Sequence, residues 1–187
     1  MSSAPTRVLA IDPIPKGIAF VVVEGGHLLL DWGFRVRQGE TKRLLERVED
    51  LISRYEPDYL VVEDFEGEGS HRRPSAEKMI RALQRLAKRR GLRCRAFSRE
   101  EIRQAFPVDM RTRSRIAKCV SERYPELGDT LPPPRKWYES GEDERMSIFD
   151  AVSLVNAFLR GRNRRSSLEQ DGREDSDHGR PARERPA

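Results

Sequence analysis

Two short runs of apolar, mostly β-branched residues each end in a carboxylate, and this pattern limits the folds open to the chain. The first run is residues 7–12 (RVLAID) and the second is residues 58–64 (DYLVVED). Such runs are typical of strands that are buried on both faces of a parallel sheet. Because sites in open α/β sheets lie beyond the carboxyl ends of the strands, the terminal acids are expected at a functional edge.

The rest of the chain alternates between strand and helix signals. A strand over 18–23, a Gly-Gly turn and a strand over 27–36 predict an antiparallel hairpin. Apolar stripes predict helices over 40–55, 75–90, 112–124 and 142–159, with a strand over 92–97 and a capped helical turn from Ser98. The order predicts an α/β fold: a mixed five-stranded sheet, with three antiparallel strands and then two parallel ones, flanked by helices.

The acids at the ends of the two apolar runs are expected to meet. Alternation along each strand places Val61 and Glu63 on one face and Asp64 on the other. If the two strands are parallel neighbours, Asp12 comes within metal-bridging distance of Glu63 or Asp64. Glu63 is the better candidate because it still belongs to the apolar strand, where an uncompensated carboxylate is costly. Asp64 is expected to be a solvated residue at the strand end.

A third acid, Asp150, lies in the last predicted helix, within the apolar run 148–155 (IFDAVSLV). A carboxylate in such surroundings needs a metal ion or a partner, and the alternative is a salt bridge to a buried arginine. Asp143 lies seven residues earlier, on the same helix face, and is a candidate fourth ligand. Its position also suits the positive end of the helix dipole. Three acids that converge at one edge predict a site for divalent metal ions.

The charge distribution indicates a polyanionic partner. The net charge is +5, and residues 71–118 contain sixteen Lys and Arg against four acids. Such an excess is typical of a nucleic-acid-binding surface, although long basic side chains also solvate helix faces. The expected contacts to phosphate are Arg72, Arg73, Lys78, Arg81, Arg85, Arg113 and Lys118.

The last part of the chain has little to bury. Residues 161–187 contain one leucine and two alanines among many charges, so we expect a disordered tail after a domain over 1–160. No apolar run approaches membrane-spanning length and the N-terminus has no signal-peptide core. We therefore expect a cytoplasmic, nucleoid-associated protein that makes no contact with membranes.

Three motifs resemble those of the RuvC family of Holliday-junction resolvases, which has the RNase H-like fold. They are residues 8–13 (VLAIDP) with Gly17 opening the next strand, residues 55–63 (YEPDYLVVE) and residues 150–152 (DAV). The resemblance covers about residues 7–160, and the order of elements agrees throughout.

The resemblance implies that Asp12, Glu63 and Asp150 are catalytic residues that bind two Mg²⁺ ions, with Mn²⁺ as a substitute. It implies a homodimer that cuts branched DNA symmetrically by two-metal hydrolysis of phosphodiesters. Arg113 matches the position near which the family has a lysine. Ser147 stands where the family has a second aspartate, and we hypothesise that it holds a metal-bound water.

Two alternatives stay open at this point. One is a catalytically weak or idle nucleic-acid-binding protein that keeps the fold as a platform, and the other is an RNA-processing nuclease of the same fold. The sequence does not decide between DNA and RNA, nor does it reveal the preferred junction sequence, the dimer geometry, a branch-migration motor or the role of the tail.

Overall fold

The computed structural model describes residues 5–36, 41–66, 73–133 and 143–174, with side chains described up to residue 164. Five strands form one sheet in the order β3-β2-β1-β4-β5. Strands β1, β2 and β3 pair antiparallel, whereas β4 is parallel to both β1 and β5. The predicted mixed sheet is therefore confirmed. The strands are β1 (Arg7–Ile14), β2 (Gly17–Glu24), β3 (Leu28–Val36), β4 (Tyr59–Glu63) and β5 (Arg93–Phe97).

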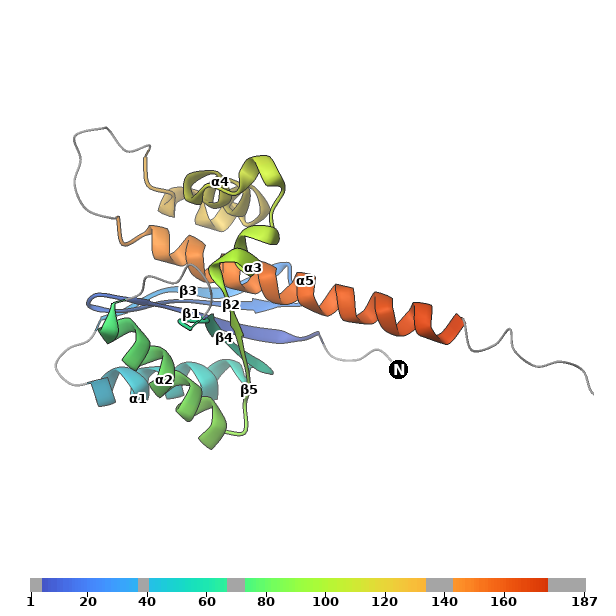
Figure 1. Ribbon diagram of the computed structural model, residues 1–187. Helices are drawn as coiled ribbons and strands as arrows, with labels where there is room; N and C mark the ends of the chain where they lie inside the picture. The colour runs from blue at the N-terminus through green and yellow to red at the C-terminus, as the bar shows by residue number, and fades with distance from the viewer. Residues whose placement is uncertain (1–4, 37–40, 67–72, 134–142, 175–187) are drawn as a thin grey trace, which may run out of the picture.

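Helices cover both faces of the sheet (Figure 1). Helices α1 and α2 pack on one face, where Leu9, Ile11, Leu60 and Val62 meet their apolar stripes. Helix α5 lies across the other face together with α3 and α4. These helices are α1 (Thr41–Tyr55), α2 (Pro74–Arg89), α3 (Arg99–Gln104), α4 (Arg113–Arg123) and α5 (Met146–Glu174), with short 3₁₀ helices at Val108–Met110 and Pro125–Thr130.

Local signals in the sequence account for the main turns. Gly25 and Gly26 both have positive φ, 60° and 79°, as a tight hairpin between β2 and β3 requires. Ser98 and Glu101 form the predicted capping box, in which each side chain accepts a hydrogen bond from the other residue's backbone N–H. Gly17 lies so close to β3 that a Cβ atom would be 2.0 Å from the carbonyl oxygen of Arg35.

The last helix differs most from its prediction. We expected residues 142–159, but α5 begins at Met146 and continues to Glu174. The helix thus includes residues 161–174, and adding residues to an established helix costs much less than starting one. The remainder of the expected tail, residues 175–187, lies outside the described residues. Within the described part of the chain, none of the helices is long and apolar enough to cross a membrane.

Candidate active site

Two of the three predicted acids lie side by side on the sheet. The parallel register pairs Ala10 with Val61, and continuing it by two residues places Asp12 beside Glu63. Both project to the face covered by α5, as Val8, Ala10 and Val61 do. Asp12 is 2% exposed and Glu63 is 4% exposed. Two adjacent carboxylates with so little access to water need positive charge nearby.

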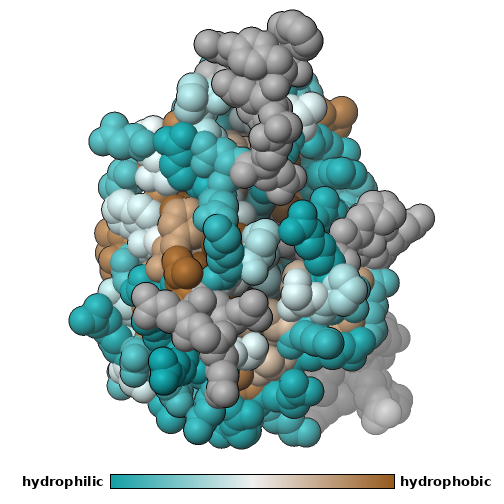
Figure 2. All heavy atoms as spheres, turned by 90° about the vertical axis from the view of Figure 1, so that its left-hand side faces the viewer, coloured by the Kyte–Doolittle hydropathy of each residue, from teal (hydrophilic) through white to brown (hydrophobic). Residues whose placement is uncertain are grey.

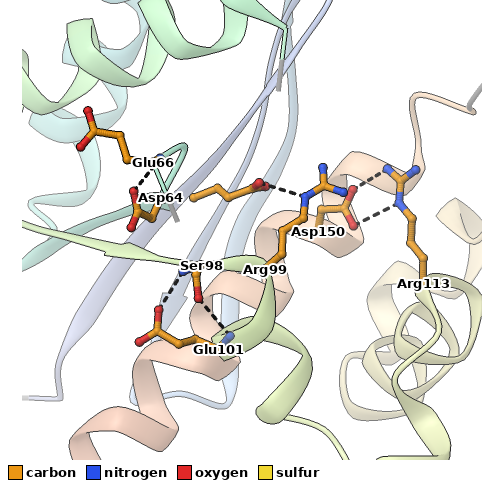
Figure 3. Close-up of polar contacts among 8 residues, drawn as sticks. Asp64, Glu66, Ser98, Arg99, Glu101, Arg113 and Asp150 are labelled. Atoms are coloured by element: carbon orange, nitrogen blue, oxygen red, sulfur yellow. Dashed lines mark hydrogen bonds and ion pairs between the residues drawn. The ribbon is translucent and has the colours of Figure 1, made fainter. Parts of the chain in front are cut away.

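The end of strand β4 explains why Glu63, rather than Asp64, lies beside Asp12. Strand β4 ends at Glu63, and the backbone N–H of Asp64 donates to the carbonyl of Phe97. The Asp64 carboxylate instead accepts a hydrogen bond from the backbone N–H of Glu66, 3.0 Å away (Figure 3). Strand β1 does not stop at Asp12, because its antiparallel pairing with β2 continues to Ile14.

Asp150 reaches the same site from α5. Its helix is buried from Ala151 to Phe158, yet the Asp150 side chain is 29% exposed and lines a cavity that also contains Asp12 and Glu63. The cavity has a volume of about 660 Å³, within the range of ligand sites. The structure therefore brings together all three predicted acids, from β1, β4 and α5.

Arginines neutralise two of these acids. Arg99, the first residue of α3, donates from Nε to Oε1 of Glu63 at 3.0 Å. Arg113, the first residue of α4, donates from Nε to Oδ1 of Asp150 at 3.3 Å and from Nη2 to the other carboxylate oxygen (Figure 3). The alternative of an arginine partner for Asp150 is thus realised, although Arg113 is 40% exposed rather than buried.

Positive charge exceeds negative charge around the cavity. Five arginines and three carboxylates are among its described lining residues. Guanidinium groups match phosphate oxygens in a bidentate geometry. A site with this composition can bind a phosphodiester. The five arginines are Arg73, Arg99, Arg103, Arg111 and Arg113.

The chemistry of the three acids fits Mg²⁺, which prefers a few carboxylate oxygens together with water and phosphate oxygens. The arrangement of the acids does not by itself form such a site: among the described residues, no group of three or more His, Cys, Asp and Glu side chains is placed to hold a metal ion. Arg99 and Arg113 occupy carboxylate oxygens that a metal would use. The donors are suitable for Mg²⁺, but two of them are engaged by guanidinium groups.

The other predicted residues divide between this site and the outer surface. Ser147 is 7% exposed and lines the cavity, as does Arg73. Asp143 does not line it: its carboxylate binds Arg145, whose hydrogen bonds lower the pKa of Asp143. Lys118 lies on the exposed surface of α4.

Helix α2 carries the remaining predicted phosphate contacts. Lys78, Arg81 and Arg85 are exposed at helical spacing along one of its faces. Arg81 also binds Glu66 at 3.1 Å and stacks 4.4 Å from the ring centre of Phe65. Arg72 lies outside the described residues. Viewed from the side where α5 begins, hydrophilic residues cover most of the surface, with smaller hydrophobic patches among them (Figure 2).

Sequence reasoning missed Arg99, which it treated only as part of a capped helical turn. A signal was present, because Arg99 follows strand β5 by two residues and β5 is the parallel neighbour of β4. Residues just beyond the carboxyl ends of neighbouring parallel strands meet at one edge. Arg103 and Arg111 were missed as well, and Ser153, which donates to the carbonyl of Phe149, also lines the cavity.

Comparison with known proteins gives similarity in structure alone. No family model and no curated protein matches the sequence. A structure of Thermus thermophilus RuvC in complex with a Holliday-junction substrate matches with a TM-score of 0.58 and 19% identity, over 81% of this chain and 92% of that one. A structure of Thermus thermophilus RuvC matches with a TM-score of 0.54 and the same identity and coverage. The predicted resemblance is confirmed in the fold: this chain has the RNase H-like fold of RuvC.

Proposed function

We propose that this protein is a structure-selective endonuclease that cuts branched DNA, including Holliday junctions, by hydrolysis of phosphodiester bonds. One observation carries the proposal: Asp12, Glu63 and Asp150 line a single cavity in a chain with the fold of RuvC. Asp12 and Glu63 are almost fully buried. Carboxylates are seldom buried in this way unless they are paired or have a function.

The arginines of the cavity are suited to hold the scissile strand. Arg73, Arg103 and Arg111 line the same cavity as the acids and can bind phosphates on either side of the bond to be cut. The exposed row of Lys78, Arg81 and Arg85 on α2 provides a second phosphate-binding surface for a DNA arm. Contacts of this kind give salt-sensitive binding that depends little on base sequence.

Asp12, Glu63 and Asp150 would hold Mg²⁺, with Mn²⁺ as a substitute, and Ser147, which lines the same cavity, would orient water beside them. Bound Mg²⁺ supplies positive charge at the phosphate and lowers the pKa of water, the two requirements of phosphodiester hydrolysis at neutral pH. The protein's part is to fix the acids on rigid elements, since Asp12 and Glu63 belong to adjacent strands and Asp150 to a buried helix. Symmetric cutting of a four-way junction needs two such sites, so the proposal includes a homodimer.

A second candidate is a nucleic-acid-binding protein with little or no catalytic activity. The ion pairs of Glu63 with Arg99 and of Asp150 with Arg113 favour it, because they neutralise the acids without a metal ion. The serine at position 147 favours it too, since a hydroxyl is a weaker ligand for Mg²⁺ than a carboxylate.

Cleavage of three matched substrates separates these functions. A labelled four-way DNA junction, a linear duplex of the same sequence and a structured RNA are each incubated with the full chain and Mg²⁺. The proposed function predicts paired nicks in the junction and at least about tenfold slower cutting of the other two. Preferential cutting of the RNA would show an RNA-processing nuclease. Tight binding of the junction without any cutting would support the binding protein.

A further inference from the structure

Two acids of the candidate site are held in ion pairs whose arginines are partly exposed. The Glu63 side chain is 6% exposed whereas Arg99 is 42% exposed, and Asp150 is 29% exposed whereas Arg113 is 40% exposed. In both pairs the side chain of the arginine is more exposed than that of the acid. A strand of DNA that enters the cavity can therefore reach both arginine side chains.

A metal ion and a guanidinium group compete for the same carboxylate. The Nε of Arg99 already occupies one oxygen of Glu63, and Arg113 binds both oxygens of Asp150. A divalent cation would have to displace these donors and would also be repelled by their positive charge. The five arginines of the cavity make this repulsion larger.

A phosphodiester removes this obstacle. Its oxygens accept bidentate hydrogen bonds from guanidinium as a carboxylate does, and its negative charge offsets the charge of the arginine. Both arginines are the first residues of their helices, and their heads are partly in solvent, so a turn of the side chain suffices to change partners.

We infer that Arg99 and Arg113 are counter-ions that block the acids in the free protein and transfer to DNA phosphates on binding, so that divalent metal binds only together with DNA. This inference rests on the proposed function. It assigns to Arg99 and Arg113 control over the access of metal to Glu63 and Asp150, together with a contact to the DNA phosphates.

The inference is tested by the binding of Mn²⁺ to the full chain, measured by electron paramagnetic resonance of free Mn²⁺, which does not require cleavage. Without DNA, wild type should bind Mn²⁺ weakly, and Arg99→Gln should bind it at least about tenfold more tightly, a change of about 1.4 kcal/mol. Arg99→Lys keeps the charge and should behave as wild type. Arg113→Gln is a second, independent variant should Arg99→Gln fail to fold.

Arg103→Gln is the matched control, because Arg103 lies one turn along α3 from Arg99 and lines the same cavity. It removes the same charge and should raise Mn²⁺ affinity less than Arg99→Gln does. An equal gain in Mn²⁺ affinity in Arg99→Gln and Arg103→Gln would show that only the net charge of the cavity matters, and would overturn the inference.

The second arm adds a four-way junction whose phosphorothioate linkages resist cleavage. The same junction without protein measures the Mn²⁺ that the DNA itself binds. The junction should raise the Mn²⁺ affinity of wild type by more than Arg99→Gln does, because it releases both arginines, and it should raise the affinity of the variant by less than that of wild type. Wild type that binds Mn²⁺ equally well with and without the junction would overturn the inference. Failure of the proposed function is seen separately, as Mn²⁺ binding that follows these expectations without cleavage of a normal junction.

Discussion

The ion pair between Arg99 and Glu63 should be measurable as a coupling free energy in the metal-free protein. Arg99 donates from Nε to Oε1 of Glu63 at 3.0 Å, and Glu63 is nearly buried while Arg99 is half-exposed. Loss of one partner from a fully buried pair costs about 3–5 kcal/mol, and exposed pairs are worth about 0–1 kcal/mol. The Arg99→Ala variant should lie between these limits, at about 1.5–3 kcal/mol of lost stability.

The partner variant isolates the interaction. Glu63→Gln keeps an acceptor for Arg99 and relieves the repulsion between Glu63 and Asp12, so its free energy of unfolding should change by less than about 1 kcal/mol. In the Glu63→Gln background, Arg99→Ala no longer strands a buried charge and should cost less than about 1 kcal/mol. The cycle then gives a coupling of about 1–2 kcal/mol.

The assay is urea denaturation in the presence of a metal chelator, followed by circular dichroism, for wild type, both single variants and the double variant. The slopes with denaturant should agree among the four proteins, which shows that only the midpoint has moved. A coupling below about 0.5 kcal/mol, within the error of additivity, would refute the claim that Arg99 neutralises Glu63.

Three further predictions follow from single positions. Ser147→Asp adds a fourth carboxylate to the cavity and should raise Mn²⁺ affinity or cleavage rate; no change in either would contradict a role for Ser147 beside the metal. Lys78→Ala should weaken junction binding equally for all sequences and reduce the slope of log K against log salt by about 0.9, and an unchanged slope would place DNA away from α2. Burial raises the pKa of Tyr124, whose hydroxyl donates to the carbonyl of Gly26 at 3.0 Å. Since the folded pKa lies above the unfolded one, wild type should lose stability faster than Tyr124→Phe as the pH rises from about 9 to about 11, and parallel loss in the two proteins would contradict this.

The sequence sufficed to predict the sheet and the elements that carry the acids. Alternation along β4 predicted that Glu63 shares a face with Val61, and the structure shows that α5 covers this face. The short Gly25–Gly26 turn predicted the antiparallel hairpin correctly. These features are local, since they depend on the period of apolar residues and on the conformations that glycine permits. Asp150 was identified because a charge within an apolar helix needs compensation.

The ion pairs of Arg99 and Arg113 with the acids were not predicted, although the position of Arg99 after β5 was a signal and Arg113 was expected near phosphate. Arg99 and Glu63 are 36 residues apart, and Arg113 and Asp150 are 37 apart. Their contacts depend on where α3 and α4 begin relative to the sheet edge, which periodicity does not specify. The extension of α5 to Glu174 was missed because composition was taken to indicate disorder, although a helix already packed on the sheet can continue through polar residues.

Cleavage of a labelled four-way DNA junction by wild type and by Asp12→Asn tests the central claim most directly. Asp12 is 2% exposed and lies beside Glu63, so the amide keeps its shape while removing one negative charge from the site. With Mg²⁺ or Mn²⁺, wild type should produce paired, symmetric nicks, and Asp12→Asn should bind the junction with at least wild-type affinity but not cut it. Cutting by Asp12→Asn at the wild-type rate, or junction binding by wild type without cutting under either metal, would contradict an endonuclease centred on these three acids.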